Sequence, residues 1–230
     1  MPAPPNPPQP LRVLYEDNHL IAVWKPSGML TQADRGGDPN LMDWVKHWLA
    51  ERYGKPGKVF LGLVHRLDRP VAGVILFAKT SKAASRVSKQ FRERTVQKLY
   101  IARLEGVITP ASGHLTHFIE HTEGTRAVQV REHAFGSAKP ASLRYETRSA
   151  GRNDCVVTVR LETGRKHQIR AQFARLGHPI VGDQLYGSRK RLATPHEIAL
   201  CAVRLTLSHP TTGAEIDIAL PEASWPTSLQ

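Results

Sequence analysis

Residues Leu63 to Thr80 read LVHRLDRPVAGVILFAKT, and this stretch decides how the rest of the chain is interpreted. One carboxylate, Asp68, stands between Arg66 and Arg69, with an apolar, strand-like run on each side. This pattern predicts two strands joined by a loop that carries an acid. A nearby opposite charge favours the ionised carboxylate, which suits nucleophilic or general-base chemistry rather than proton donation. The alternative is an aspartate that caps a turn and pairs with its neighbours on the surface.

The charge balance predicts a polyanionic partner. The 230 residues include 32 Lys and Arg against 20 Asp and Glu, which gives a net charge of +12. Nucleic acid is the leading candidate, because phosphate neutralisation requires basic residues over a broad face. A membrane surface is the competing partner, but no basic amphipathic segment with a strongly apolar face is visible. No apolar run reaches the roughly 20 residues that a membrane helix requires, so we expect no membrane association.

The hydrophobic pattern predicts an α+β fold with a mixed, largely antiparallel central sheet and flanking helices. The strands are expected at residues 11–15, 20–24, 59–64, 74–79, 98–104, 114–119, 126–131, 141–148, 156–162, 198–207 and 214–220. Those between 98 and 162 suit a meander, and the last two suit a hairpin. The helices are expected at about 40–53 with Asn40 as N-cap, at 81–94 with Ser81 as cap, and at 166–176 before Gly177.

Residues 1–10, MPAPPNPPQP, have no apolar core of a secretory signal and predict a disordered proline-rich tail. No linker composition interrupts the remainder, so we expect a single catalytic domain over residues 11–230. The two cysteines, Cys155 and Cys201, lack CxxC spacing and fit reduced core residues of a cytoplasmic protein.

Four short motifs carry further candidate chemistry. They are HRLDRPVAGV around Asp68, KLYIA around Tyr100, LETGRKHQIR around Arg165 and GHPIVGDQLYG around Asp183. In this order they resemble the RluA-type pseudouridine synthases, and the likeness runs from about Leu14 to about Leu207. That resemblance implies an isomerase that converts uridine to pseudouridine in RNA without a cofactor.

The resemblance implies that Asp68 is the catalytic carboxylate, that Tyr100 packs on the target uracil and that Arg165 is the cation paired with Asp68. The reaction breaks the bond from N1 of uracil to C1′ of ribose, turns the base and rejoins it through C5. An ionised acid can attack C1′ or remove the C2′ proton to give a glycal. Both routes remain open at this point.

The target base must leave its stack before it reacts. His65 and Arg66 are candidates for holding the vacated stack or a neighbouring phosphate. The resemblance implies that Ile169 lines the uracil pocket, and we expect Arg170 in the same segment to contact RNA. Lys25 is a candidate for a phosphate contact, although Lys-Pro after a strand also fits simple turn chemistry.

The chain departs from the family pattern at Val71-Ala72, where the family usually has Thr-Ser. The two absent hydroxyls bear on loop rigidity and substrate preference. We expect the partner to be structured RNA, a transfer-RNA or ribosomal-RNA stem-loop, and the protein to be a monomer. Basic residues of the second predicted helix are either a further RNA contact or a solvated face. They are Lys82, Arg86, Lys89, Arg92 and Arg94.

Two rival functions remain. The first is a catalytically inactive RNA-binding or RNA-chaperone protein of the same fold. The second is a metal-dependent phosphodiesterase that uses Asp68 and Asp183, although Asp183, in a Gly-rich loop, is more simply expected to bind backbone N–H groups of its turn. His114, His117 and His121 have offsets that would share a face only on a helix. Because this segment is expected to be a strand, we expect no metal site.

Overall fold

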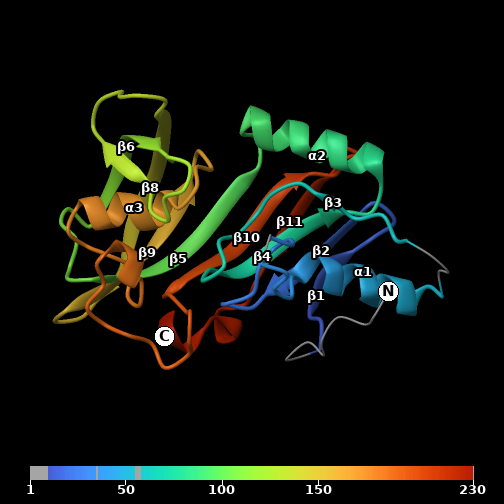
Figure 1. Cartoon of the computed structure of the whole chain (residues 1–230), viewed down its shortest axis with the longest axis horizontal. Coiled ribbons are helices and arrows are strands. Elements are labelled where there is room, and N and C mark those ends of the chain that lie inside the picture. The colour runs from blue at the N-terminus through green and yellow to red at the C-terminus, as the bar shows by residue number, and fades with distance from the viewer. Residues whose placement is uncertain (1–9, 35, 55–57, 230) are drawn as a thin grey trace. The chain divides into compact units, whose positions relative to one another are not determined.

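The structure is a computed structural model that describes residues 10–34, 36–54 and 58–229. Apart from Pro10, the predicted proline-rich tail lies outside the described residues. The chain forms two compact units (Figure 1). The first unit contains Met1–Val96 and Leu205–Leu220, and the second contains Gln97–Arg204 and Pro221–Gln230. That the two units act as one catalytic domain stays a prediction.

In its described residues, the first unit is a sheet with two helices. Its strands are β1 (Val13–Glu16), β2 (Leu20–Lys25), β3 (Gly62–Leu63), β4 (Ala72–Ala78), the C-terminal part of β10 (Leu200–Ser208), and β11 (Glu215–Ala219). They pair in the order β1-β2-β4-β10, with β3 on β4 and β11 on β10. The pairs β1–β2, β2–β4 and β3–β4 are antiparallel. The helices are α1 (Leu41–Arg52) and α2 (Ser81–Glu93).

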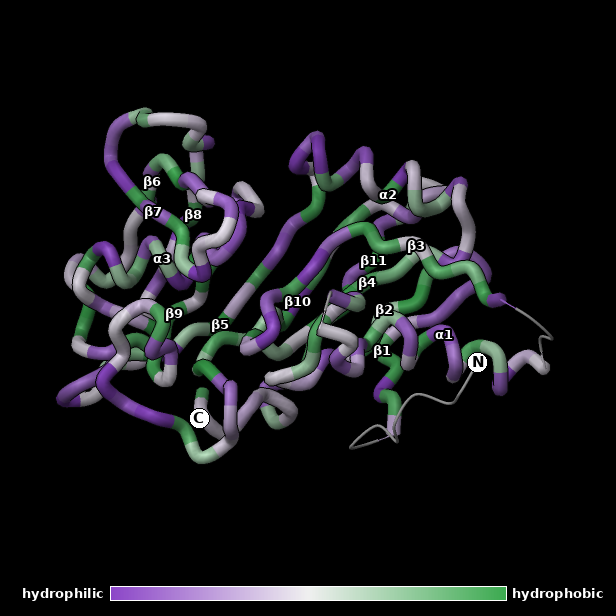
Figure 2. Tube along the Cα trace, in the orientation of Figure 1, coloured by the Kyte–Doolittle hydropathy of each residue, from purple (hydrophilic) through white to green (hydrophobic). Residues whose placement is uncertain are grey.

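Strand β4 forms the centre of this unit because all seven of its residues are buried. Its sequence, AGVILFA, is apolar without alternation, as expected of a strand that is covered on both faces. Figure 2 shows the same concentration of hydrophobic residues in β2 and β4. Helix α2 packs on β3 and β4 through buried Ala83 and Val87. The predicted strand at 59–64 was too long, because only Gly62–Leu63 pair with β4.

The helix caps confirm one prediction and shift another by one residue. The Asn40 side chain accepts a hydrogen bond from the Asp43 N–H, as expected of an N-cap. For α2 the cap is Thr80, whose hydroxyl accepts from the Ala83 N–H, and Ser81 is the first helical residue. Both helices therefore begin where a short polar side chain satisfies a free backbone donor.

The second unit is a sheet with one α-helix, α3 (Gln168–Arg175). Its strands are β5 (Gln97–Glu105), β6 (Ser112–Glu120), β7 (Gln129–Arg131), β8 (Lys139–Ala150), β9 (Asp154–Leu161) and the N-terminal part of β10. The pairing order is β10-β5-β9-β8-β6-β7, and the pairs β5–β9, β8–β9, β6–β8 and β6–β7 are antiparallel. With the first unit, this confirms the predicted mixed, largely antiparallel α+β fold.

The predicted meander was wrong for β5, which pairs with β9 and not with the following strand β6, although the consecutive strands β6 and β7, and β8 and β9, do pair. The middle of β5, residues 100–102, is buried on consecutive positions, as expected of a strand that is covered on both faces. Strand β6 alternates between exposed and buried residues and lies near the edge of the sheet. Pairing between residues that are distant in sequence therefore determines the order of the strands, which the local sequence did not predict.

Helix α3 begins two residues later than predicted, because His167 has a left-handed backbone with a φ of 54°. Figure 1 shows α3 beside β6 and β8, and its buried Phe173 packs edge-on against Tyr145 of β8, with ring centroids 5.6 Å apart. In the described part of the chain, no helix is long and apolar enough to cross a membrane.

Candidate active site

The loop that carries Asp68 is held by the segment that follows β2. The Thr31 hydroxyl donates to the Leu67 carbonyl at 2.8 Å and accepts from the Leu67 N–H at 3.3 Å. The Ser27 hydroxyl donates to the Pro70 carbonyl at 2.7 Å. These contacts fix the backbone on both sides of Asp68, so the loop is ordered by hydrogen bonds to side chains about 40 residues earlier in the chain.

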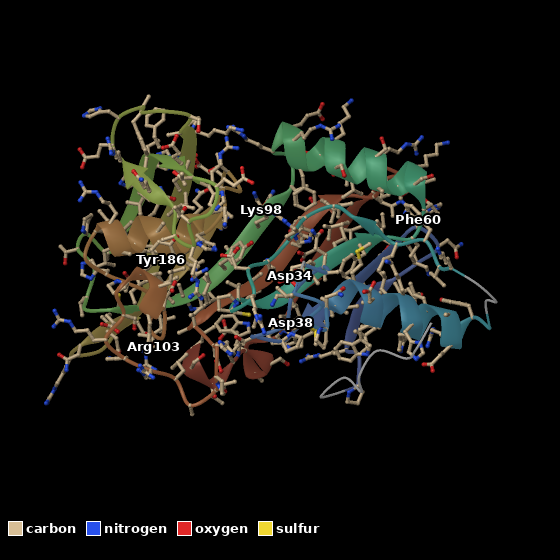
Figure 3. All side chains as sticks on the ribbon, viewed as in Figure 1. Asp34, Asp38, Phe60, Lys98, Arg103 and Tyr186 are labelled. Atoms are coloured by element: carbon tan, nitrogen blue, oxygen red, sulfur yellow. The ribbon has the colours of Figure 1, made fainter. Side chains whose placement is uncertain are left out.

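Arg69 belongs to the same framework. Its Nε donates to the Gly28 carbonyl at 2.9 Å, and its guanidinium pairs with Asp38 at 2.8 Å. Its carbonyl accepts from the Gly28 N–H at 2.9 Å. Asp38, labelled in Figure 3, therefore forms an ion pair with Arg69, which is next to Asp68 in the sequence.

Lys25 is buried beneath this loop, with 0% of its surface exposed. Its ammonium donates to the carbonyls of Pro26 at 3.0 Å, Met29 at 2.7 Å and Arg69 at 3.1 Å. An ammonium has three N–H donors, so all of them have partners. Burial lowers the pKa of Lys25 to about 7, while the Asp68 charge raises it and the Arg69 charge lowers it. This geometry supports the Asp68 loop and leaves no exposed ammonium for a phosphate.

His65 also has contacts within the unit. Its Nε2 accepts from the Leu76 N–H at 2.9 Å, so the proton of a neutral ring resides on Nδ1. The ring stacks on Phe91 of α2, with centroids 4.8 Å apart and planes 19° from parallel. His65 thus joins the loop to β4 and α2.

Two side chains of the Asp68 loop, those of Arg66 and Asp68, are accessible to solvent. Arg66 is exposed and Asp68 is half-buried, whereas Leu67 between them is buried. Val71 and Ala72 are each 3% exposed. Hydroxyls at these two positions would require buried partners, so aliphatic side chains suit the packing found here.

In the second unit, Gln168 holds the turn that contains Arg165. The Gln168 Oε1 accepts from the Arg165 N–H at 3.0 Å and from the Thr163 hydroxyl at 2.7 Å. Its amide nitrogen donates to the Ser142 carbonyl at 3.0 Å, and the Ser142 N–H donates to the Thr163 hydroxyl at 2.9 Å. Gln168 is 3% exposed, so these bonds form a buried network that ties the turn to β8.

Arg165 itself is half-buried, and its Nε donates to the Pro140 carbonyl at 3.0 Å. Tyr100 is 8% exposed on β5, where it lies opposite Val159 of β9. Ile169 is 6% exposed on the first turn of α3. The second unit thus holds the three residues expected to contact or support the uracil and the acid.

Arg170 forms a buried ion pair with Asp183. Its Nε and one terminal nitrogen donate to the two carboxylate oxygens at 2.6 Å and 2.9 Å. The guanidinium carbon lies 5.1 Å from the ring centre of Tyr186, labelled in Figure 3, whose hydroxyl is 2.8 Å from Nδ1 of His167. The carboxylate of Asp183 therefore binds a guanidinium, and the expectation that it binds the backbone of its own turn was wrong.

The structure thus groups the predicted site residues by unit. The first unit holds Lys25, His65, Arg66 and Asp68, and the second holds Tyr100, Arg165, Ile169 and Arg170. Their catalytic and RNA-binding roles stay predictions. Sequence reasoning missed Thr31 and Gln168, which fix the two loops. For Gln168 the bond to the Arg165 N–H resembles that of a capping box, but Arg165 is not the cap of α3, which is His167, so no direct signal was present in the local sequence.

The two histidines of β6 contact different partners. His114 pairs with Glu162 at 2.9 Å, and His117 contacts the Gln172 amide at 2.9 Å. Burial lowers the pKa of His117. Within residues 10–34, 36–54 and 58–229 no group of three His, Cys, Asp or Glu side chains has a metal-binding arrangement.

Comparisons with known proteins agree with these motifs. The family model described as RNA pseudouridylate synthase matches residues 19–175. The dual-specificity RNA pseudouridine synthase RluA of Escherichia coli O6:H1 is 36% identical over 219 residues, which cover 94% of this chain and 96% of that protein. The ribosomal large subunit pseudouridine synthase D of Yersinia pestis is 33% identical, covering 93% of this chain and 68% of that protein.

A solved structure, human RNA pseudouridylate synthase domain containing 1, has a similar fold. It superposes with a TM-score of 0.75 at 24% identity and covers 97% of this chain and 88% of that one. The fold, the family model and the identity over most of the chain agree, and the chain belongs to the RluA-type RNA pseudouridine synthases.

Proposed function

We propose that this enzyme isomerises specific uridines in transfer-RNA or ribosomal-RNA stem-loops, with Asp68 as the catalytic carboxylate. The observation that supports this most is the loop around Asp68. Thr31 and Lys25 hold its backbone from below, while Asp68 stays half-buried and Arg66 is exposed. A carboxylate on a fixed backbone meets the positional requirement of covalent or proton-transfer catalysis.

The chemistry needs only rearrangement of the substrate's own atoms. In the nucleophilic route, an Asp68 oxygen bonds to C1′ and the N1–C1′ electron pair leaves with the uracil. The turned base then attacks C1′ through C5, the carboxylate departs, and the proton lost from C5 is balanced by one gained at N1. In the glycal route, Asp68 removes the C2′ proton while the N1–C1′ bond breaks, which releases uracil and leaves a C1′–C2′ double bond. The turned base then bonds to C1′ through C5, the proton returns to C2′, and C5 loses a proton while N1 gains one. Both routes require an ionised acid next to the sugar.

Tyr100 and Arg165 complete the proposed reaction centre. A tyrosine ring offers a flat face for uracil and a hydroxyl for hydrogen bonding. The Arg165 guanidinium is proposed to form charge-assisted bonds to Asp68, and Gln168 orients the turn that carries Arg165. Ile169 supplies apolar surface to the pocket.

The other residues predicted to contact RNA differ in whether their side chains are exposed or are held by contacts inside their unit. Arg66 is exposed beside the acid and is suited to the vacated stack or the neighbouring phosphate. Lys25, His65 and Arg170 have contacts inside their units, and we assign them to support of the loops. RNA contact by these three is the less favoured assignment.

By their names, one relative is a dual-specificity RNA pseudouridine synthase and the other is a pseudouridine synthase of the ribosomal large subunit. For this chain we propose a transfer-RNA or ribosomal-RNA substrate, a cytoplasmic location and a monomeric state. Pseudouridine mapping across total RNA from cells lacking the protein, with rescue by the wild type, identifies the target.

An Asp68→Asn variant tests the role of the acid in the same assay. Loss of the modification at every rescued position supports the proposal, provided the variant is folded. A wild-type protein that binds RNA but forms no pseudouridine would instead show a catalytically inactive RNA-binding protein.

A further inference from the structure

A basic surface lies on the second unit, in the segment after α3. Residues 188–191 read Ser-Arg-Lys-Arg, and Arg189 and Arg191 are exposed. In the part of the chain that the structure describes, neither guanidinium forms an ion pair. We propose that Arg189 and Arg191, with Arg103, Arg152 and Lys190, bind phosphates of the substrate RNA outside the loop that presents the uridine.

The backbone of this segment is held by one carboxylate. Glu105, at the end of β5, accepts hydrogen bonds from the N–H groups of Arg189 and Lys190, each at 2.9 Å, and from the Ser188 hydroxyl. Although burial raises the pKa of Glu105, these bonds lower it below its usual value. The Ser188 hydroxyl also accepts from the Gly182 N–H at 2.9 Å. The arginine side chains therefore extend from a fixed backbone, which lowers the entropic cost of binding.

A second carboxylate gathers the remaining cations. Asp154 pairs with Lys190 at 2.9 Å and with Arg103 at 3.1 Å, and Arg103 is labelled in Figure 3. The Asp154 carbonyl accepts from the Gly151 N–H at 2.8 Å and closes the turn that carries exposed Arg152. Two cations thus pair with Asp154, while Arg152, Arg189 and Arg191 are exposed on the segments whose backbone Asp154 and Glu105 hold. This excess of positive charge favours a polyanion.

RNA is the occupant that this surface fits best. Arginine forks bind phosphate in a bidentate manner, and a fixed row of them matches the repeated charge of a nucleic-acid backbone. The choice of RNA rests on the proposed function. On β5, Arg103 is three residues from Tyr100, so the two side chains leave opposite faces of the strand. The surface therefore contacts RNA away from the reacting base.

The test is binding of unfractionated transfer RNA, measured by filter binding at several KCl concentrations. The Arg189→Gln/Arg191→Gln variant removes two guanidinium groups but keeps the Glu105 and Asp154 contacts. We expect about tenfold weaker binding and a salt dependence lowered by about 2 in the slope of log K against log[KCl]. Arg189→Lys/Arg191→Lys keeps the charges and should restore the slope and most of the affinity.

The matched control is Lys46→Gln/Lys58→Gln, which removes the same net charge from the first unit and should change binding less than about twofold. Affinity and slope of the Arg189→Gln/Arg191→Gln variant equal to those of this control would overturn the proposal. That result would also follow if the surface bound an acidic protein instead. Because binding is measured without turnover, an inactive wild type would overturn the proposed reaction and leave this test intact.

Discussion

The buried pair between Arg170 and Asp183 allows a prediction that depends only on the structure. The side chains are 5% and 2% exposed and share two hydrogen bonds, at 2.6 Å and 2.9 Å. Removing one partner leaves the other charge buried without compensation, which typically costs about 3–5 kcal/mol. We therefore expect Arg170→Met and Asp183→Asn each to lower the free energy of unfolding by about that amount.

This loss corresponds to a melting temperature lower by about 6–20 °C for a chain of this size. The double variant should lose less than the sum of the two single losses, because the second substitution removes a charge that is already uncompensated. Circular dichroism in urea measures all three values. The coupling energy is expected to be about 1–3 kcal/mol.

The matched control is the exposed pair between Arg144 and Glu162, whose atoms are 2.9 Å apart and whose side chains are 61% and 36% exposed. Arg144→Met should cost less than about 1 kcal/mol, because water screens an exposed pair. If Asp183→Asn lowers the free energy of unfolding by no more than this control does, the assignment of Arg170 to structural support is refuted. A direct contact between Arg170 and RNA then becomes the favoured assignment.

Three further predictions concern the two loops. Because burial lowers the pKa of Lys25 to about 7 from 10.5, the unfolded chain binds more protons between these values. The stability of the wild type relative to Lys25→Met should therefore be greatest above pH 10.5 and should fall as the pH is lowered to 7. Urea titrations at several pH values measure this difference, and the absence of such a trend would contradict the reasoning. Thr31→Val removes both hydroxyl contacts to Leu67 and should cost about 2 kcal/mol in the same titration, whereas an unchanged stability would show that these bonds contribute nothing. Gln168→Met removes the acceptor for the Arg165 N–H and should lower kcat about tenfold or more, with partial recovery in Gln168→Glu; in single-turnover assays, equal rates for wild type and both variants would exclude a positioning role.

The local sequence was sufficient to predict an element where the residues that determine it lie within the same segment. Asn40 before an apolar helical repeat predicted α1, and the unbroken apolar run of β4 predicted a buried strand. The loop at Asp68 was expected between two strands because proline and glycine follow the acid. In each case the deciding interaction lies within a few residues.

The parts that sequence reasoning missed depend on contacts far along the chain. The pairing of β5 with β9 joins residues about 60 positions apart at its widest, Leu99 and Arg160. The bond from Thr31 to Leu67 spans 36 positions. Nor does the Lys-Pro pair at Lys25 reveal that its ammonium is buried beneath a loop 44 residues away. Such contacts form only when the whole core assembles, so no local pattern encodes them.

The central claim is that Asp68 performs the isomerisation. The most direct measurement maps pseudouridine in total RNA from cells lacking the protein after incubation with purified wild type, Asp68→Asn or Asp34→Asn. Asp34 is an exposed carboxylate of the same unit that caps its own turn. We predict new pseudouridine at the same positions with wild type and Asp34→Asn, and none with folded Asp68→Asn. Modification by Asp68→Asn at the wild-type rate would contradict the claim.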